Sequence, residues 1–408
     1  MSAQDTHASG TTQTVDGLVP LEGGASTLRI AAVLGVLGLG ATAAGGMMGP
    51  SKEAMVSYLV AFAYWCGLSL GGLFLVMIFN AAGARWTVVL RRAMETLASA
   101  LPLFVLLFLP IALGAKNLYV WLEPGKLVGE ARELVEHKHL WLNQTSFFLR
   151  AAAYFAIFVV LQHLLYGWSV KQDSQGSAQL TRSQRRLSTG GLPILALAFS
   201  VAGIDWLMTL EPTFSSTIFG VYFFAGSFLG AIALLVVVTA LARGVPSGHA
   251  GLVSTHHWHN LGKLCLAFTS FWAYIAVSQY LLIWIANLPE EIPWYILRSQ
   301  GPWTPVFVAL GLSQFVLPFF TLLSRDIKLQ PSKMLFVGLW IMAAHWLDIF
   351  WLVVPAFNEQ PHFHWTQLTA FVGVGGAAVA FALFRARGKF AVPVGDPYLD
   401  DSLRYTQP

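Results

Sequence analysis

The stretch "LPILALAFSVAGIDWLMTLEP", from Leu192 to Pro212, decides the fold class. Its apolar part is long enough for an α-helix to cross the hydrocarbon core of a bilayer. Asp205 lies inside this apolar run, where a carboxylate costs roughly 2.5–3.5 kcal/mol to insert. The stretch therefore predicts a transmembrane helix whose carboxylate needs a partner, water or a proton.

The rest of the chain has the same character. Of 408 residues, 56% are hydrophobic and 11% are charged, and the apolar residues fall in long blocks. This composition is typical of an all-α polytopic membrane protein. We expect a ten-helix membrane domain over 27–384, between a polar tail (1–26) and a C-terminal tail (385–408). The predicted spans are 27–48, 56–79, 94–115, 146–170, 192–210, 217–242, 262–286, 304–323, 334–354 and 365–384.

Basic residues sort by side of the membrane. With these spans, 17 Lys and Arg residues fall on the side of the two termini and 7 on the opposite side. The positive-inside rule then places both termini in the cytoplasm. The net charge of +4 and the pI of about 9.0 follow from this topology, so nucleic acid is not an expected partner.

Two predicted spans end alike. Asp205 precedes Pro212, and Asp348 precedes Pro355, by the same seven residues. The two spans are four apart and therefore run in the same direction, which fits two parallel repeats. We expect two four-helix bundles, spans 2–5 and spans 6–9, with spans 1 and 10 peripheral. A coincidence of two short patterns is the alternative.

The two aspartates are the leading candidates for chemistry. His345 lies one helical turn before Asp348, so the two form an acid–base pair on one face of a helix. A buried carboxyl of this kind is either a proton-exchanging site or a neutral group that is hydrogen-bonded to a neighbouring helix. Two such carboxyls at matching positions favour proton exchange.

Span seven adds a polar stripe. Lys263, Ser270, Tyr274 and Ser278 are spaced to share one helical face, where hydroxyls could hold a chain of waters. The alternative is that each hydroxyl bonds to its own helix backbone.

Ligands for cofactors are sparse in this sequence. Cys66 and Cys265 are too few for an iron–sulfur cluster or a c-type haem. His163 and His345 are the only histidines inside predicted spans, which makes a weak case for a b-type haem. We assign no metal site and no catalytic residue, and we keep His163 and His257 as additional candidates for the proton path.

The segment 286–303, rich in aromatic residues, could hold a quinone headgroup.

Two blocks resemble a known family. "GIDWLMTLEPTFSSTIFGVYFFAG" (Gly203 to Gly226) and "HNLGKLCLAFTSFWAYIAVSQYLLIWIANLPEEIPWY" (His259 to Tyr295) resemble the NrfD/polysulfide-reductase-like membrane subunits of bacterial alternative complex III, a quinol:cytochrome c oxidoreductase. The second block is nearest the ActF subunit. The resemblance covers spans two to ten.

The resemblance implies a subunit of the bacterial inner membrane that binds no prosthetic group itself. Its expected partners are a paralogous NrfD-like subunit, periplasmic iron–sulfur and multihaem cytochrome c subunits, other small membrane subunits and lipids. Matched by position, the family's proton-path residues fall on Asp205, Glu211, Lys263, Tyr274, His345 and Asp348. Thr213-Phe214 stands where the family has His-Trp, which weakens any role for a histidine there.

The expected function is therefore to anchor a respiratory quinol oxidoreductase and to conduct protons, with quinone binding as a secondary role. Such a subunit is not catalytic by itself. A stand-alone proton-coupled secondary transporter and a purely structural membrane anchor are the alternatives.

Overall fold

The structure, a computed structural model, describes residues 20–21, 24–49, 51–242 and 249–406. The predicted tail 1–26 therefore lies almost wholly outside the described residues. Within them, ten helical segments are long and apolar enough to cross a membrane, and there is no β-strand. The chain is an all-α, multi-pass membrane protein, as its composition predicts.

The spans consist of the following helices. Six are single helices: α1 (Ala25–Met48), α2 (Ser51–Ala82), α8 (Gln144–Gln175), α10 (Phe219–Leu241), α11 (Thr255–Ala286) and α17 (Trp365–Ala386). Two end in a 3-10 turn: α9 (Ala178–Trp206) with η4 (Met208–Leu210), and α16 (Pro331–Val353) with η9 (Val354–Ala356). The third span is broken into η1 (Arg85–Thr87), α3 (Val88–Ala98), α4 (Leu101–Leu107) and α5 (Leu109–Leu113), and the eighth into α13 (Thr304–Leu310), the π-helical η8 (Gly311–Val316) and α14 (Leu317–Leu323).

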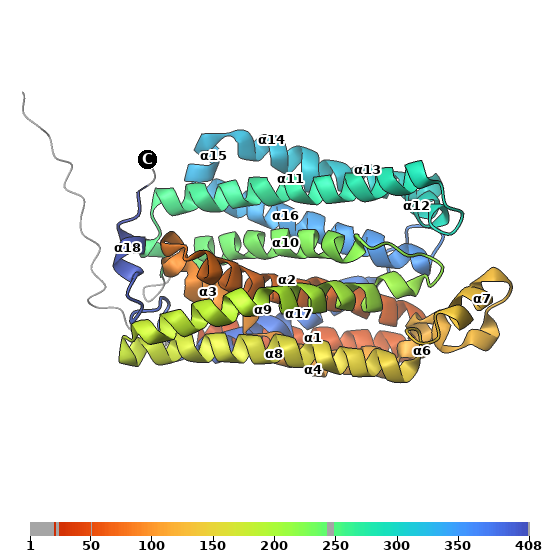
Figure 1. Cartoon of the computed structure of the whole chain (residues 1–408), viewed down its shortest axis with the longest axis horizontal. Coiled ribbons are helices and arrows are strands. Elements are labelled where there is room, and N and C mark those ends of the chain that lie inside the picture. Colours follow the sequence, from red (N-terminus) through yellow and green to blue (C-terminus); the bar gives the residue numbers. More distant parts are fainter. Residues whose placement is uncertain (1–19, 22–23, 50, 243–248, 407–408) are drawn as a thin grey trace, which may run out of the picture.

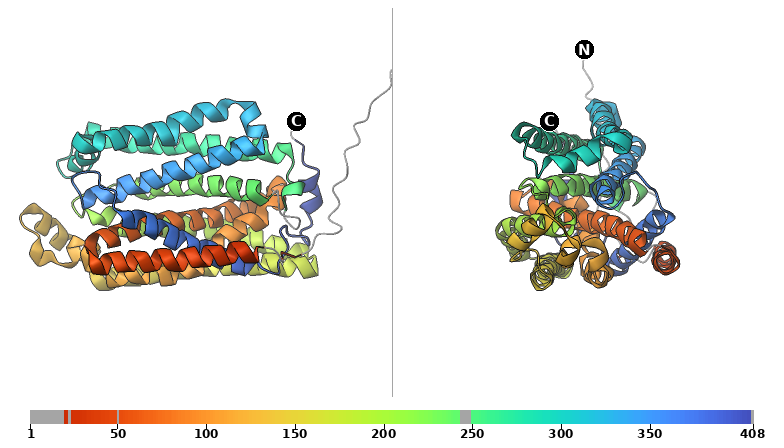
Figure 2. Two further views of the ribbon diagram at one scale, coloured as in Figure 1. Left: turned by 180° about the vertical axis from the view of Figure 1, so that it is seen from behind. Right: turned by 90° about the vertical axis from the view of Figure 1, so that its right-hand side faces the viewer.

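The spans group as predicted. In spans two to five, α2 packs against α3 and α9, and α8 packs against α9; in spans six to nine, α10 packs against α11 and α16, and the eighth span packs against α11 and α16. The two groups meet where α2 lies against α10 (Figure 1). The first and last spans, α1 and α17, pack against each other on one flank, as the end-on view shows (Figure 2).

Small residues permit these close contacts. A Cβ atom added at Gly38 in α1 would lie 2.5 Å from the backbone nitrogen of Gly373 in α17. One added at Gly71 in α2 would lie 2.4 Å from the Cβ of Ala231 in α10. Helix pairs in membranes associate through such small residues because the backbones can then approach closely.

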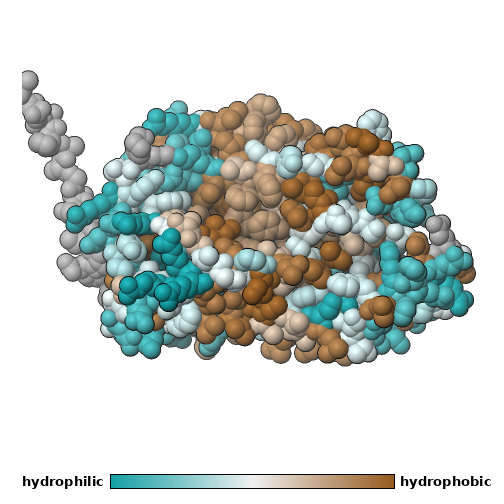
Figure 3. All heavy atoms as spheres, in the orientation of Figure 1, coloured by the Kyte–Doolittle hydropathy of each residue, from teal (hydrophilic) through white to brown (hydrophobic). Residues whose placement is uncertain are grey.

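The surface carries a wide hydrophobic band between two hydrophilic ends (Figure 3). The ends differ in their elements: α7 (Glu130–His137) and α12 (Ile292–Ser299) lie at one, and α15 (Arg325–Leu329) and α18 (Leu399–Leu403) at the other (Figure 1). This distribution is what a bilayer-spanning bundle requires.

Several helices extend beyond the predicted spans, α9 by the most residues. Helix α9 begins at Ala178 rather than at 192, because Ser177 caps it by accepting from the Gln179 N–H and the polar segment 178–191 is helical. The C-terminal tail is folded back on the bundle: the Ser402 hydroxyl accepts from the Val89 N–H, and Asn260 donates to the Tyr405 hydroxyl.

Candidate functional site

Asp348 lies at the centre of a buried polar cluster near the end of α16. Its Oδ1 accepts from the Tyr222 hydroxyl of α10 at 2.5 Å, and its Oδ2 accepts from the Trp272 indole N–H of α11 at 3.2 Å. The side chain is 1% exposed. Three helices thus converge on one carboxylate, which makes it the best-enclosed acid of the second bundle.

His345 lies one turn away on the same helix. Its Nδ1 is 3.5 Å from Asp348 Oδ2, and neither ring nitrogen makes a hydrogen bond within the described residues. The imidazole is fully buried, with its ring centroid 5.2 Å from that of Tyr64 in α2. A buried imidazole without partners costs about 1–3 kcal/mol, and a water or a shared proton would remove that cost.

Two glycines of α10 make room for this pair. A Cβ added at Gly226 would lie 2.7 Å from Asp348 Oδ2, and one at Gly230 would lie 2.9 Å from His345 Cδ2. Side chains at these positions would displace the acid–base pair. The small residues therefore serve the site as well as the packing of α10.

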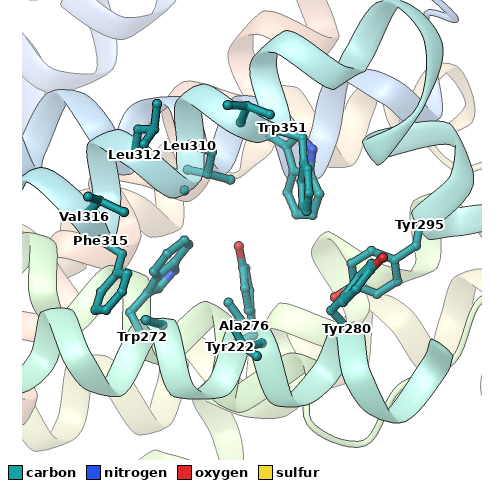
Figure 4. Close-up of a pocket in the computed structure, with 15 residues that line it drawn as sticks. Tyr222, Trp272, Ala276, Tyr280, Tyr295, Leu310, Leu312, Phe315, Val316 and Trp351 are labelled. Atoms are coloured by element: carbon teal, nitrogen blue, oxygen red, sulfur yellow. The ribbon is translucent and has the colours of Figure 1, made fainter. Parts of the chain in front are cut away.

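An apolar cavity of about 370 Å³ opens beside this cluster, between α10, α11, α13 and η8. The Tyr222 hydroxyl points into it from the floor, between Trp272 on one side and Tyr280 and Tyr295 on the other (Figure 4). At its mouth, Val277 and Val308 are 62% and 51% exposed on the hydrophobic band. Cavities of this size and lining hold small apolar ligands that carry one or two polar groups.

Asp205 has a different environment. Arg150 of α8 binds it in a bidentate pair, with Nε 2.7 Å from Oδ2 and Nη2 3.0 Å from Oδ1. The Tyr154 hydroxyl and the Trp141 indole N–H also donate to it, at 2.8 and 2.9 Å. The carboxylate is fully buried in the last turn of α9 and is saturated with donors. This arrangement fixes a charged carboxylate in place.

Glu211 is held in a similar way at the same end of the molecule. Arg298 of α12 donates to its Oε1 at 2.5 Å and to the Leu352 carbonyl at 3.0 Å. Burial lowers the pKa of Arg298 below its ordinary value, and the neighbouring Glu211 carboxylate opposes that shift. Phe214 stacks on Trp294 with ring centroids 4.6 Å apart.

The polar stripe of span seven lies on the outer face of α11. Lys263 and Tyr274 are exposed, Tyr274 by 68%, and the Ser270 hydroxyl donates to the Leu266 carbonyl of its own helix. Ser278 is half-buried. These residues therefore lie on the outward side of α11 and line no enclosed path within the described part of this chain, so their role in a proton path stays a prediction.

The additional candidates lie apart from the cluster. His163 is exposed on α8, and His257 caps α11 through its Nδ1, which is 2.7 Å from the Ser254 hydroxyl. Lys263 lies near Lys328 of α15, whose pKa is lowered by burial and then by the positive charge of Lys263. Of the predicted residues, the structure brings together only His345 with Asp348.

Sequence reasoning missed several members of these clusters. Tyr222, Trp272 and Arg150 all lie within predicted spans, and each could have been found as a polar or amphipathic group on a helix face. Glu95, in predicted span 94–115, is also buried, and Arg92 lies 3.2 Å from it. Asp173 in turn accepts from Arg92 at 2.7 Å.

No protein-family model matches this chain, and no curated protein is similar to it in sequence.

Proposed function

We propose that this chain is a proton-conducting membrane subunit of a respiratory quinol:cytochrome c oxidoreductase of the alternative complex III type. In that role it anchors the complex in a bacterial inner membrane, beside a paralogous NrfD-like subunit and under the periplasmic iron–sulfur and multihaem subunits. The observation that supports it best is a single one: a buried acid–base pair, Asp348 and His345, meets the floor of an apolar cavity through Tyr222.

The local geometry suits proton transfer. The Tyr222 hydroxyl donates to Asp348 and faces the cavity, so a proton accepted from the cavity side can be passed on to the carboxylate. The Nδ1 of His345 lies 3.5 Å from Asp348 Oδ2, close enough to exchange a proton with it after a small movement. Asp348 and His345 are therefore the proposed proton carriers. Before Asp205 could carry a proton, its bidentate ion pair with Arg150 would have to break.

The cavity fits the headgroup of a quinone. Aromatic rings line it, and the Tyr222 oxygen, whose proton is donated to Asp348, can accept a hydrogen bond from a quinol hydroxyl. A quinol, when bound, would supply protons and electrons. The residues of this chain would orient the ring between Trp272 and Tyr280, exclude water and take up a proton at Asp348.

Substitution of Asp348 tests the proposal. In the purified complex reconstituted into vesicles, Asp348→Asn should still assemble, because the amide oxygen can accept from Tyr222, whereas proton translocation should fall. His345→Gln should reduce translocation as well. Asp326→Asn, at an exposed acid of the same bundle, is the matched control and should behave like the parent. If Asp348→Asn and His345→Gln both translocate protons like the parent, the chain is an anchor.

A further inference from the structure

A polar pocket of about 180 Å³ lies at the other end of the bundle, where α18 packs. It is formed by the end of α2, by η1 and by the first turns of α9. The polar side chains of the described residues that line it include no acid: Asn80, Arg85, Arg91, Thr181, Arg182, Arg185 and Tyr398. A concave site with this lining attracts an anion.

Two of the four arginines are already neutralised. Arg85 pairs with Asp401 at 2.8 Å, and Arg91 pairs with Asp396. Arg182 and Arg185 make no ion pair and no side-chain hydrogen bond within the described residues. The pocket wall therefore carries two uncompensated positive charges, both on one face of α9.

Asn80 provides an independent indication of a ligand. Its side chain is 8% exposed and lines the pocket, yet its Nδ2 has no hydrogen-bond partner within the described residues. Buried amide donors are normally paired, so this one indicates an acceptor that the protein itself does not supply. A rotation of the Asn80 amide would bring Nδ2 to the pocket surface, where an oxygen atom of an anion would satisfy it.

The backbone at Gly83 leaves room for the Arg185 guanidinium group. Gly83, between α2 and η1, has a φ of +64°, and the Arg185 guanidinium carbon lies 3.5 Å from where a Cβ of Gly83 would be. A glycine adopts this positive φ without strain and has no side chain next to the Arg185 guanidinium group.

The depth of the pocket relative to the membrane indicates which kind of anion it binds. Arg185 precedes Leu192, where the apolar run of α9 begins, by seven residues, which is about 10 Å of helical rise. Long arginine side chains at that distance reach the level of the lipid headgroups. Phe79 and Ala82 add apolar surface to the same pocket. We propose that this pocket binds the phosphodiester group of an anionic membrane phospholipid.

The test compares lipids that differ only in headgroup. The full chain is reconstituted into nanodiscs that contain phosphatidylglycerol and phosphatidylcholine with identical acyl chains, and lipid retained after release into detergent is counted by native mass spectrometry. The parent should retain phosphatidylglycerol in preference to phosphatidylcholine. The variant Arg182→Gln/Arg185→Gln should bind phosphatidylglycerol roughly 30-fold more weakly. Each arginine near the membrane surface contributes about 1 kcal/mol of binding free energy to an anionic lipid, and about 1.4 kcal/mol corresponds to a tenfold change in affinity.

Two further variants sharpen the test. Lys171→Gln/Arg186→Gln removes two exposed charges from the same end of the molecule but outside the pocket, and it should retain phosphatidylglycerol like the parent. Asn80→Asp leaves both arginines in place, sets a carboxylate against the phosphate and should weaken retention. This variant keeps the test decisive if the double arginine variant is unstable.

Three outcomes would overturn the proposal. The first is equal retention of phosphatidylglycerol and phosphatidylcholine by the parent. The second is unchanged retention in both the arginine variant and Asn80→Asp. The third is displacement of the lipid by millimolar inorganic phosphate but not by added phosphatidylglycerol, which would assign the pocket to a free phosphate instead.

Discussion

Asp205 and Asp348 are the same residue type in opposite electrostatic settings. Asp205 faces a guanidinium group and two further donors, whereas Asp348 faces a phenol, an indole and an imidazole. A carboxylate paired with arginine stays charged and fixed. One surrounded by neutral donors can gain or lose a proton without leaving a buried cation behind. This difference assigns the two acids different tasks.

The ion pair of Asp205 leads to a stability prediction. Asp205→Asn leaves the partly buried Arg150 guanidinium without its counter-charge, which should lower the free energy of unfolding by about 3 kcal/mol. The double variant Arg150→Met/Asp205→Leu removes both charges and should recover most of that loss. Thermal unfolding in detergent measures both variants.

Asp348→Asn is the comparison, because it strands no charge and should unfold close to the parent. If Asp205→Asn is as stable as the parent, the carboxylate is not held as an anion, and Asp205 returns to the proton path as a candidate.

The sequence predicts which acids are buried better than it predicts their partners. An Asp in an apolar run of span length is costly wherever it lies, so Asp205 and Asp348 stand out without any knowledge of the fold. Their partners do not, because Arg150 is 55 residues from Asp205 and Tyr222 is 126 residues from Asp348. Pairings at that separation depend on which helices pack together.

At the scale of the helix, rotation about the axis decides which side chains meet. Residues spaced by seven, four and four on α11 do share a face, as predicted, but that face turns outward, and Trp272 and Thr269 face inward instead. Periodicity in a membrane helix shows that side chains are aligned, not where they point, because lipid and protein interior are both apolar. The inward face is fixed by the packing of α10, η8, α14 and α15 against α11.

The contact between α1 and α17 gives a prediction with a control in the same helix. Gly38→Val should push α1 away from α17, because the new side chain would overlap the backbone of Gly373. Gly40→Val should be tolerated, because a Cβ at Gly40 meets nothing within 4 Å. The expected result is a lower temperature of unfolding for Gly38→Val only.

A disulfide between engineered cysteines in α1 and α17 would report the separation directly. Equal stability and equal cross-linking in the two valine variants would mean that the two helices are not held by backbone contact. Because α1 and α17 lie on the flank, neither variant should change the environment of Asp348.

At the scale of the whole molecule, two basic residues that enter the topology prediction also hold helices together. Arg91 and Arg92 count towards the positive side of the membrane, yet both are buried and ion-paired in the structure. Arg91 ties the C-terminal segment to α3 through Asp396, and Arg92 ties α8 to α3 through Asp173. This end is therefore a folded cap as well as a charged surface.

The orientation of the chain in the membrane is the last prediction, and cysteine accessibility tests it. Ser174 is exposed at the end of α8, on the side that carries 17 of the Lys and Arg residues, and Gly125 is exposed on the opposite side. Cys66 and Cys265 are buried, so they should not react with a membrane-impermeant maleimide. In right-side-out membranes, Gly125→Cys should therefore be labelled, whereas Ser174→Cys should be labelled only after permeabilisation. The parent chain measures the background. Labelling of Ser174→Cys but not of Gly125→Cys would show that the chain has the opposite orientation. The cavity beside Asp348 would then lie towards the cytoplasmic side, and a path that releases protons to the outside could not begin there.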